Sequence, residues 1–240
     1  MKILAFDSTA KLASVAVSEG ERILASYSID NGLTQSELLL PMAEDILRSL
    51  KLGFDDIDLL ACSVGPGSFT GVRIGVSLVK GIAFGRNIPC AKVSTLEALA
   101  MNMAGTDGII LPCMDARRGQ FYSAIFEGTE GGVHRLCADE AISAQELANK
   151  LYAYAERKIY AVGDGYETAH KLLAPLGIKL SQTPPLSRGQ SAASIAILAA
   201  RMAERKELVT DCELAPIYLR APQAERERLE RLDANKAANN

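Results

Sequence analysis

Apolar and polar positions in the first half of the chain separate into short apolar runs and longer stretches of helical period. Short apolar runs predict strands, and apolar positions three and four apart predict helices. The runs that predict strands cover residues 2–6, 14–17, 22–29, 59–64 and 91–93. The helical stretches cover residues 34–50, 68–84 and 94–103. Three strands followed by alternating helices and strands are typical of an α/β fold.

Capping signals stand at the starts of the predicted helices. A hydroxyl residue followed three positions later by Glu occurs at Thr34, Ser94 and Ser143. In such a capping box the two side chains satisfy backbone N–H groups at the helix start. Ser68 precedes the second helical stretch, and we expect it to be the N-cap of that helix.

The pattern begins again in the second half of the chain. An apolar run at residues 109–114 ends at Asp115, and residues 121–126 predict a strand that pairs with it. The same order occurs in FDSTAKLASVAV near the N-terminus, and the later AVGDG repeats the form of SVGPG. This internal similarity predicts a duplicated α/β unit.

The duplication divides the chain into two halves and a tail. We expect an N-terminal α/β domain at residues 1–104 and a reduced C-terminal α/β domain at residues 105–220. The second half ends with a predicted helix at 189–205 and an extended segment at 214–219. Residues 221–240 contain few apolar side chains, so we expect a solvated helix fragment or a flexible tail.

Glycines are concentrated in SVGPGSFTGVRIG, residues 63–75. Gly65 and Gly67 suit a strand-to-helix turn where the backbone turns left-handed or approaches another group closely. Gly71 and Gly75 lie four residues apart, on one face of the predicted helix. Two interpretations remain open: an anion cradle at the helix N-terminus, and a bare helix face for close packing.

Composition narrows the function classes. The 240 residues are 48% hydrophobic and 23% charged, which suits a globular protein with a full core. A net charge of −3 argues against a broad basic surface for nucleic acid, and an aromatic content of 5% argues against a base-stacking platform. Five cysteines without a CxxC pair indicate buried thiols in a reducing compartment. The sequence shows no signal peptide and no apolar run long enough for a membrane span, so we expect a cytoplasmic protein.

Four segments carry a specific resemblance to a known family. They are MKILAFDST, SVGPGSFTGVRIG, MDARRGQFY and PIYLR. Together they resemble the TsaB family, which belongs to the bacterial complex that makes threonylcarbamoyladenosine in tRNA. The resemblance extends over roughly residues 1–220. It implies a duplicated actin-like (RNase H-like) ATPase-type fold in which the second half is reduced.

The resemblance also implies a function and partners. It implies a non-catalytic subunit that pairs with TsaD, the related subunit that holds metal and nucleotide. TsaD transfers the threonylcarbamoyl group to N6 of the adenosine next to the anticodon of ANN-decoding tRNAs. The resemblance further implies TsaE as an ATPase partner, a homodimer when the TsaD-type paralogue is absent, and only indirect contact with tRNA.

Catalytic motifs are missing where the related enzymes carry them. In the TsaD branch an HxxxH motif holds the metal, and this chain has Thr95 and Leu99 at those positions. Neither side chain is an ordinary ligand for a divalent ion. His134 and His170 lie in no motif, and the sequence contains no HExxH. We therefore expect no metal site and no catalytic residues.

A nucleotide or anion site has weak support. The candidate residues follow the first strand and occupy the glycine-rich turn, and they are Asp7, Ser8, Thr9, Gly65, Gly67 and Ser68. The turn lacks the Gly-Lys-Ser/Thr ending of a Walker A loop. Asp115 is followed by Ala-Arg-Arg, which does not offer the close backbone approach of glycine; the arginines could hold an anion or form a salt-bridged turn. We expect no cofactor of the chain's own, with weak ATP or ADP binding left open.

Two alternatives come from other classes. An autonomous ATPase or small-molecule kinase of the same fold would hydrolyse ATP in isolation and depend on Asp7. A homodimeric binding module without a tRNA role would bind no TsaD.

The two predicted helices in the first half are candidates for a partner interface. Apolar positions on helix 34–50 span a wide arc, and Pro41 is expected to kink this helix. Gln35 stands where many relatives have His, and its amide can still form hydrogen bonds. The predicted interface residues are Leu38, Leu39, Met42, Ile46, Gly71, Val72, Gly75, Val76 and Val79. On this interpretation, Gly71→Leu or Gly75→Leu blocks pairing while the monomer stays folded.

Overall fold

Five strands form the sheet of the N-terminal half, in the order β3-β2-β1-β4-β5. The computed structural model describes residues 1–220, so the predicted tail at 221–240 lies outside the described residues. The strands are β1 (Lys2–Asp7), β2 (Ala13–Glu19), β3 (Arg22–Ile29), β4 (Leu59–Ser63) and β5 (Cys90–Val93). The first three pair antiparallel, and β4 and β5 continue the sheet in parallel with β1. The strand ends differ from the sequence prediction by two residues or fewer.

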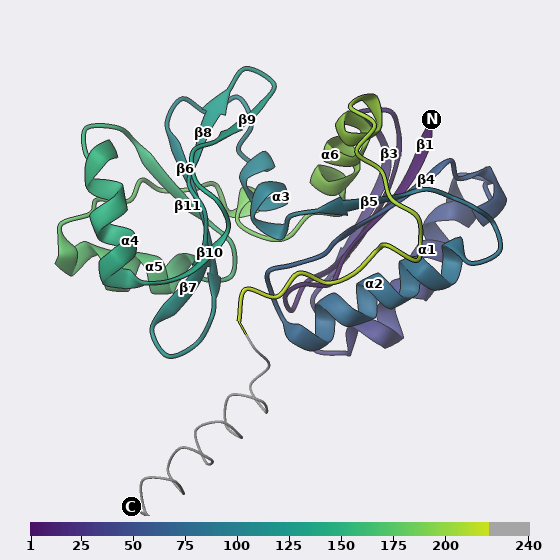
Figure 1. Ribbon diagram of the computed structural model, residues 1–240, viewed down its shortest axis with the longest axis horizontal. Helices are drawn as coiled ribbons and strands as arrows, with labels where there is room; N and C mark the ends of the chain where they lie inside the picture. Colours follow the sequence, from purple (N-terminus) through teal and green to yellow (C-terminus); the bar gives the residue numbers. More distant parts are fainter. Residues whose placement is uncertain (221–240) are drawn as a thin grey trace, which may run out of the picture.

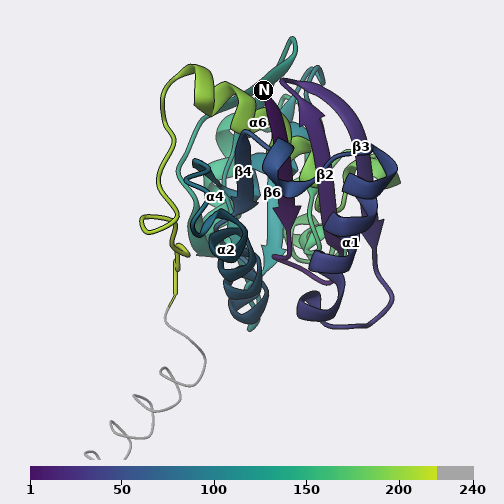
Figure 2. The ribbon, with the colours of Figure 1, turned by 90° about the vertical axis from the view of Figure 1, so that its right-hand side faces the viewer.

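Helices cover both faces of this sheet (Figures 1 and 2). On one face, α1 (Gln35–Ser49) and α2 (Phe69–Ala83) lie side by side and fill a core with β1, β2 and β4. On the other face lies α6 (Ala192–Glu204), which packs against the opposite side chains of the same strands. The sheet is therefore buried on both faces, which explains why its strands are apolar runs rather than alternating patterns.

The predicted caps are present at the helix starts. Glu37 accepts hydrogen bonds from the backbone N–H and the hydroxyl of Thr34, at 2.9 and 2.7 Å. The hydroxyl of Ser68 accepts from the N–H of Gly71 at 3.2 Å. Ser94 and Ser143 accept in the same way from residues three positions on. α1 continues through Pro41 as one helix.

Six strands form the sheet of the C-terminal half. They are β6 (Ile109–Asp115), β7 (Gln120–Ser123), β8 (Phe126–Thr129), β9 (Gly132–Arg135), β10 (Glu140–Ser143) and β11 (Ile159–Val162). β6 is central: it pairs antiparallel with β7 and β8 and parallel with β11. One face is covered by α4 (Ala144–Leu151) and α5 (Tyr166–Leu173), and the other by α3 (Thr95–Met101). Short 3₁₀ turns lie at Phe54–Asp56, Tyr152–Tyr154, Ala174–Leu176 and Pro185–Ser187.

The predicted strand at 121–126 is wrong in one respect, because the structure divides it into β7 and β8. The break falls opposite Pro112 in β6, whose nitrogen has no hydrogen to donate to the ladder. Instead, the hydroxyl of Ser123 donates to the carbonyl of Pro112 at 2.7 Å. Ile125 turns toward the chain after β9, where the backbone N–H groups of Leu136 and Cys137 donate to its carbonyl. β7 then pairs with β10, and β8 with β9.

The topology confirms the duplicated, actin-like plan predicted from the sequence. In each half, a β-hairpin is continued by a parallel strand: β1, β2 and β4 correspond to β6, β7 and β11. Asp7 and Asp115 end the first strand of their halves. Gly65 and Gly163 follow the parallel strands, and both have left-handed backbones, with φ of 115° and 104°.

The two halves exchange helices across the division predicted at residue 104. α3 comes from the first segment but packs mainly on β6, and α6 comes from the second segment but packs on the N-terminal sheet. Figure 1 shows both helices between the two sheets. The exchange follows from burial, since each sheet would otherwise leave one apolar face uncovered.

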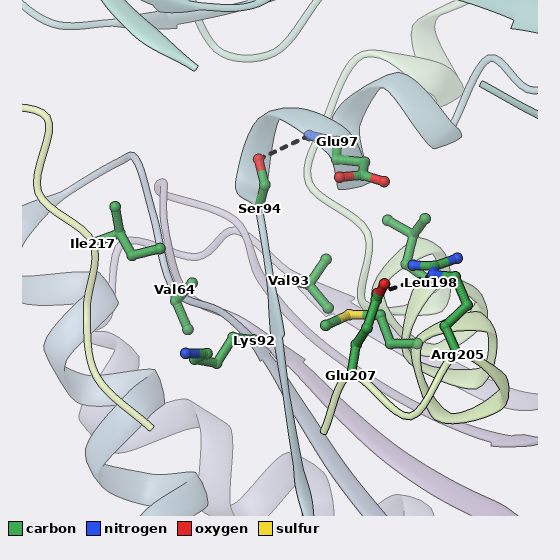
Figure 3. Close-up of a pocket in the computed structure, with 10 residues that line it drawn as sticks. Val64, Lys92, Val93, Ser94, Glu97, Leu198, Arg205, Glu207 and Ile217 are labelled. Carbon is green, nitrogen blue, oxygen red and sulfur yellow. Dashed lines mark hydrogen bonds and ion pairs between the residues drawn. The ribbon is translucent and has the colours of Figure 1, made fainter. Parts of the chain in front are cut away.

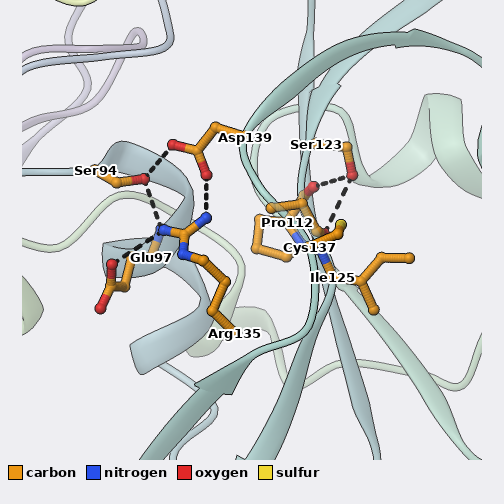
Figure 4. A network of polar contacts seen from close by, with 9 residues as sticks. Ser94, Glu97, Pro112, Ser123, Ile125, Arg135, Cys137 and Asp139 are labelled. Carbon is orange, nitrogen blue, oxygen red and sulfur yellow. Dashed lines mark hydrogen bonds and ion pairs between the residues drawn. The ribbon is translucent and has the colours of Figure 1, made fainter.

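An ionic cluster ties α3 to the C-terminal sheet (Figure 4). Arg135 on β9 binds Glu97 of α3 at 3.0 Å and also binds Asp139. Asp139 accepts a hydrogen bond from the N-cap hydroxyl of Ser94 at 2.6 Å. The Arg135 guanidinium lies over the ring of Phe126, at 4.5 Å from its centroid. One arginine therefore joins the start of α3 to β8 and β9.

Within residues 1–220, no helix combines the length and the hydropathy that crossing a bilayer requires.

Candidate functional site

The carboxyl ends of β1 and β4 bring together the residues predicted to bind nucleotide. Asp7 ends β1 and is 1% exposed. Its Oδ1 accepts hydrogen bonds from the backbone N–H and the hydroxyl of Thr9, at 2.9 and 2.7 Å. Its Oδ2 accepts from the hydroxyl of Ser63 at 2.9 Å. The carboxyl of Asp7 is therefore surrounded by donors from its own chain.

Burial controls the ionisation of Asp7. Removal from water raises the pKa of its carboxyl, and the hydrogen bonds from Thr9 and Ser63 oppose that rise.

The glycines of the turn are required by contacts within the chain. The N–H of Ser68 donates to the carbonyl of Thr9 at 2.8 Å. A Cβ at Gly67 would lie 2.7 Å from the Thr9 carbonyl oxygen and 3.3 Å from Cε of Met114. A Cβ at Gly65 would lie 2.5 Å from the carbonyl oxygen of Ile217. The β1–β2 loop and the C-terminal segment therefore lie directly against the glycines of this turn.

Gly71 and Gly75 let α2 lie close to the loop after β1. A Cβ at Gly71 would overlap the backbone carbonyl oxygen of Ser8, and one at Gly75 would overlap the Ser8 hydroxyl. That hydroxyl donates to the carbonyl of Gly71 at 2.8 Å. Of the two interpretations of these glycines, close packing applies, and the neighbour is a loop of the same half. Leucine at either position would therefore disturb the monomer itself, contrary to the sequence expectation.

Residues 207–220 form a segment, here called the strap, that runs from α6 back over β5 and α2. Val209 exchanges both backbone hydrogen bonds with Cys90 of β5. Leu214 is fully buried in the core under α1 and α2. Further along, the N–H of Ile217 donates to the carbonyl of Val64 at 2.7 Å, directly before Gly65. The strap therefore covers the glycine-rich turn.

The nine residues predicted to contact a partner lie in the core instead. All nine are buried and face the sheet or the β1–β2 loop: Leu38, Leu39, Met42, Ile46, Gly71, Val72, Gly75, Val76 and Val79. The sequence pattern identified the buried stripe of each helix correctly but assigned it to the wrong neighbour. An apolar stripe that is wide enough to contact two neighbours does not show by itself which neighbour belongs to the same chain.

The outer faces of α1 and α2 remain available to a partner. Leu40 is 39% exposed, and Phe84 at the end of α2 is 78% exposed. The outer face of α2 also carries the half-buried side chains of Ile74 and Leu78 and the exposed Gly81. We call Leu40, Pro41, Ile74, Leu78, Gly81 and Phe84 the helix-pair surface. In the sequence, this surface is indicated by apolar residues that fall on the side of each helix away from its buried stripe.

The histidines of the described residues lie on other elements than the Asp7 cluster, as do Cys90 and Cys113. No three side chains that commonly bind metal come together within residues 1–220. His134 is exposed on β9, and His170 packs against the ring of Tyr166 in α5. Burial raises the pKa of the Cys113 thiol to about 12 and that of Cys90 to about 11, so both thiols stay protonated at neutral pH.

A pocket of about 200 Å³ opens beside the outer edge of β5 (Figure 3). Arg205 and Glu207 at its rim bind each other at 2.9 Å. The hydroxyl of Ser94 is engaged as the cap of α3. The residues that line the pocket are Val64, Lys92, Val93, Ser94, Glu97, Leu198, Met202, Arg205, Glu207 and Ile217. The pocket holds no nucleophile next to a base and none of the Asp7 cluster.

Comparison with known proteins gives concordant similarities. Residues 34–227 match the family model described as TsaD, tRNA N6-adenosine threonylcarbamoyltransferase. The chain is 31% identical to the tRNA threonylcarbamoyladenosine biosynthesis protein TsaB of Bacillus subtilis, over 94% of this chain and 96% of that protein. It is 30% identical to the Escherichia coli TsaB, over 92% and 95%. Among solved structures, YeaZ from Pseudomonas aeruginosa aligns with a TM-score of 0.76 at 24% identity, over 91% of this chain and 99% of that chain.

Proposed function

Because this chain belongs to the TsaB family of tRNA threonylcarbamoyladenosine biosynthesis proteins, we propose that it is a non-catalytic subunit of a tRNA threonylcarbamoyltransferase. Its partner in this role is a TsaD-type paralogue, which carries the metal, the nucleotide and the transfer to N6 of adenosine. Both proteins act in the cytoplasm on ANN-decoding tRNAs, and a TsaE-type ATPase completes the set.

The observation that carries the proposal is the closed Asp7 cluster. In an ATPase of this fold, the end of β1 and the glycine-rich turn would face nucleotide phosphates. Here, Thr9 and Ser63 occupy the carboxyl oxygens of Asp7, and the strap lies against Gly65. These groups stabilise the fold of the N-terminal half through contacts within the chain.

Pairing with the paralogue is assigned to the helix-pair surface. The match to the TsaD family model implies a shared fold, so both proteins have helices at the places of α1 and α2. Two such helix pairs can pack face to face as a four-helix bundle. The same surface serves a homodimer when the paralogue is absent, and the two assemblies compete for it.

The mechanism is a shift of population. A subunit that binds the competent state of TsaD more tightly than its other states increases the population of the competent state. The equilibrium between the states shifts by the ratio of the two affinities. Contact with tRNA is left to the paralogue in this proposal.

Gly81→Arg tests the pairing surface. A Cβ at Gly81 meets no atom within 4 Å, so the monomer accepts the larger side chain. In the assembly, the arginine would stand between the helix pairs. We expect the variant to lose association with the TsaD-type paralogue in light scattering behind size exclusion, while its circular dichroism stays that of the wild type.

The matched control is Asn149→Arg, at an exposed position of α4 in the C-terminal half. This variant should associate with the paralogue as the wild type does. Association of the Gly81 variant at wild-type affinity would rule out the helix-pair surface.

A further inference from the structure

The outer edge of β5 is only partly covered by the strap. β5 is the last strand of the N-terminal sheet, so its outer edge has no neighbouring strand in the described chain. The strap pairs with this edge where Cys90 and Val209 exchange backbone hydrogen bonds at 2.8 and 2.9 Å. Closer to α6, the N–H of Glu207 turns away from β5 and donates to the carbonyl of Met202. The strap therefore leaves the edge beyond Cys90 open.

The open part of the edge presents the backbone of Lys92. The carbonyl of Val93 faces the neighbouring strand β4, because it accepts from the N–H of Val64 at 3.0 Å. Cys90 faces the other way, toward the strap. Backbone groups of successive strand residues point to alternate sides, so Lys92 faces outward as Cys90 does. Its N–H and carbonyl therefore point to the side that the strap leaves open.

The pocket of about 200 Å³ lies along this open edge (Figure 3). Val64 and Ile217 lie on one side of β5, and Leu198 lies on the other side. Ile217 is 51% exposed, so the pocket is apolar up to its rim. We call this part of the pocket the edge groove, and it consists of Val64, Lys92, Val93, Leu198, Met202 and Ile217.

The charge of Lys92 is not neutralised within the pocket. Glu97 and Glu207, the two carboxylates that line the pocket, are bound to arginines at 3.0 and 2.9 Å. In the strap, hydrogen bonds from Thr210 lower the pKa of Glu213, and Lys92 adds a smaller effect. Glu213 therefore lies within the field of Lys92, but its carboxylate is engaged by Thr210 at 2.9 Å. A further carboxylate beside Lys92 would be attracted to it.

The alternation of side chains determines which residues an added strand would carry. Lys92 shares its face of the sheet with Cys90, on the side of α1 and α2, whereas Val93 points to the side of α6. A residue paired directly opposite Lys92 would place its side chain next to the ammonium group. Its two neighbours would point to the side of α6, where Leu198 and Met202 line the groove. The edge groove therefore fits an acidic residue between two apolar residues.

Lysine at this position also makes the edge selective. A lysine on an edge strand discourages pairing with unselected chains, which is a common protection against aggregation. Opposite a carboxylate the same charge becomes an attractive cross-strand pair, and opposite another lysine it is repulsive. Lys92 can therefore admit one kind of strand and reject others.

We propose that the open edge of β5 binds an extended segment of a partner protein, which adds a strand to the N-terminal sheet and carries an acidic residue between two apolar residues. Backbone hydrogen bonds to Lys92 provide affinity, and the side-chain contacts provide specificity. The site is built from β5, α6 and the strap rather than from the outer faces of α1 and α2. It is therefore distinct from the helix-pair surface and goes beyond the proposed function.

The test is binding of fluorescent peptides to the full chain, measured by fluorescence anisotropy. The first peptide contains Val-Glu-Val between threonines, which favour an extended backbone. A second peptide has Lys in place of Glu, and a third carries an N-methyl group on the Glu amide, which then cannot donate to the carbonyl of Lys92. The protein variants are Lys92→Glu and the matched control Lys158→Glu, at an exposed lysine of the C-terminal half. Circular dichroism checks that both variants are folded.

We expect the wild type to bind the Val-Glu-Val peptide with a Kd below about 1 mM. Lys92→Glu should weaken this binding about tenfold and should prefer the Val-Lys-Val peptide, because the cross-strand charges are then reversed. Preference for the reversed peptide also shows that the variant keeps its edge. The N-methyl peptide should not bind, and Lys158→Glu should stay within about twofold of the wild type.

Three results would overturn the proposal. They are the absence of Val-Glu-Val binding by the wild type up to about 1 mM, binding of the N-methyl peptide with equal affinity, and equal losses in the two variants. A synthetic peptide of residues 221–240 that displaces the fluorescent peptide would assign the edge to the chain's own C-terminal residues and would also overturn it. Pairing with the TsaD-type paralogue is measured separately through Gly81→Arg, so failure here leaves the proposed function standing.

Discussion

At the scale of single residues, the glycines of α2 have opposite environments. Gly71 faces the carbonyl of Ser8, where a methyl group has no room, whereas Gly81 faces open space. The sequence places all four glycines of residues 63–75 in one motif, and spacing alone cannot tell which neighbour fills the space above each. The neighbour of Gly71 comes from a loop more than sixty residues earlier, so its presence depends on the sheet having formed.

Gly71→Ala should lower the free energy of unfolding by about 1–3 kcal/mol, because the added methyl displaces the β1–β2 loop. Gly81→Ala on the same helix should raise it by about 0.5–1 kcal/mol, since alanine favours the helix and meets nothing. Urea denaturation of the two variants measures both. Equal effects at the two positions would contradict the packing assigned to α2.

Asp7 predicts a pH dependence with a definite sign. Burial raises the pKa of this carboxyl in the folded protein above its value in the unfolded chain. The folded state therefore keeps the proton longer, and the contribution of Asp7 to stability is fully present below the unfolded pKa and is lost as pH rises through the folded pKa.

Relative to wild type, Asp7→Asn should gain stability as the pH rises from about 4 to 7, because the amide cannot ionise. Denaturation curves across this range measure the difference, and its slope with pH is the readout. A difference that shrinks over the same range would show that the fold favours the charged carboxylate.

At the scale of elements, local signals predicted what is local. Thr34, Ser68, Ser94 and Ser143 cap the helices they were expected to cap, since an N-cap contact spans only four consecutive residues. The break between β7 and β8 was missed, because it depends on Pro112 in the neighbouring strand. A single apolar run cannot reveal which strand lies opposite it.

The strap is an element whose role follows from one buried side chain. Leu214 is fully buried under α1 and α2, and Lys80 of α2 donates to the carbonyls of Cys212 and Leu214. The extended segment was expected from sequence, but its place on the glycine-rich turn follows only from the three-dimensional path of the chain.

Leu214→Ala should destabilise the protein by about 2–5 kcal/mol, as is usual for removing a fully buried leucine. Ile217→Ala, at a side chain that is 51% exposed, should cost about 1 kcal/mol. Thermal and urea denaturation compare the two. Similar small costs would mean that the strap is not anchored in the core.

At the scale of the whole molecule, the duplicated fold and the family could both be read from the sequence. The halves repeat a hairpin and a parallel strand, and the motifs of the glycine-rich turn and of MDARRGQFY identify the relatives. The exchange of α3 and α6 between the halves could not be read in this way. It depends on which apolar sheet face lacks a cover, and that is a property of both halves together.

The same limit applies to the candidate site. The candidate residues around Asp7 lie together, since they follow adjacent strands at the same edge of the sheet. Whether they surround a ligand or one another depends on the β1–β2 loop and the strap. The residues predicted to form an interface lie on the buried faces of α1 and α2.

The central claim is that this chain is a required but non-catalytic subunit. The most direct test is threonylcarbamoyl transfer to tRNA in a reconstituted mixture of the TsaD-type paralogue and the other components, with and without this chain. The account predicts full product with the chain, loss of product when it is omitted, and no transfer by the chain alone. Full product in its absence, or transfer by the isolated chain, would contradict the account.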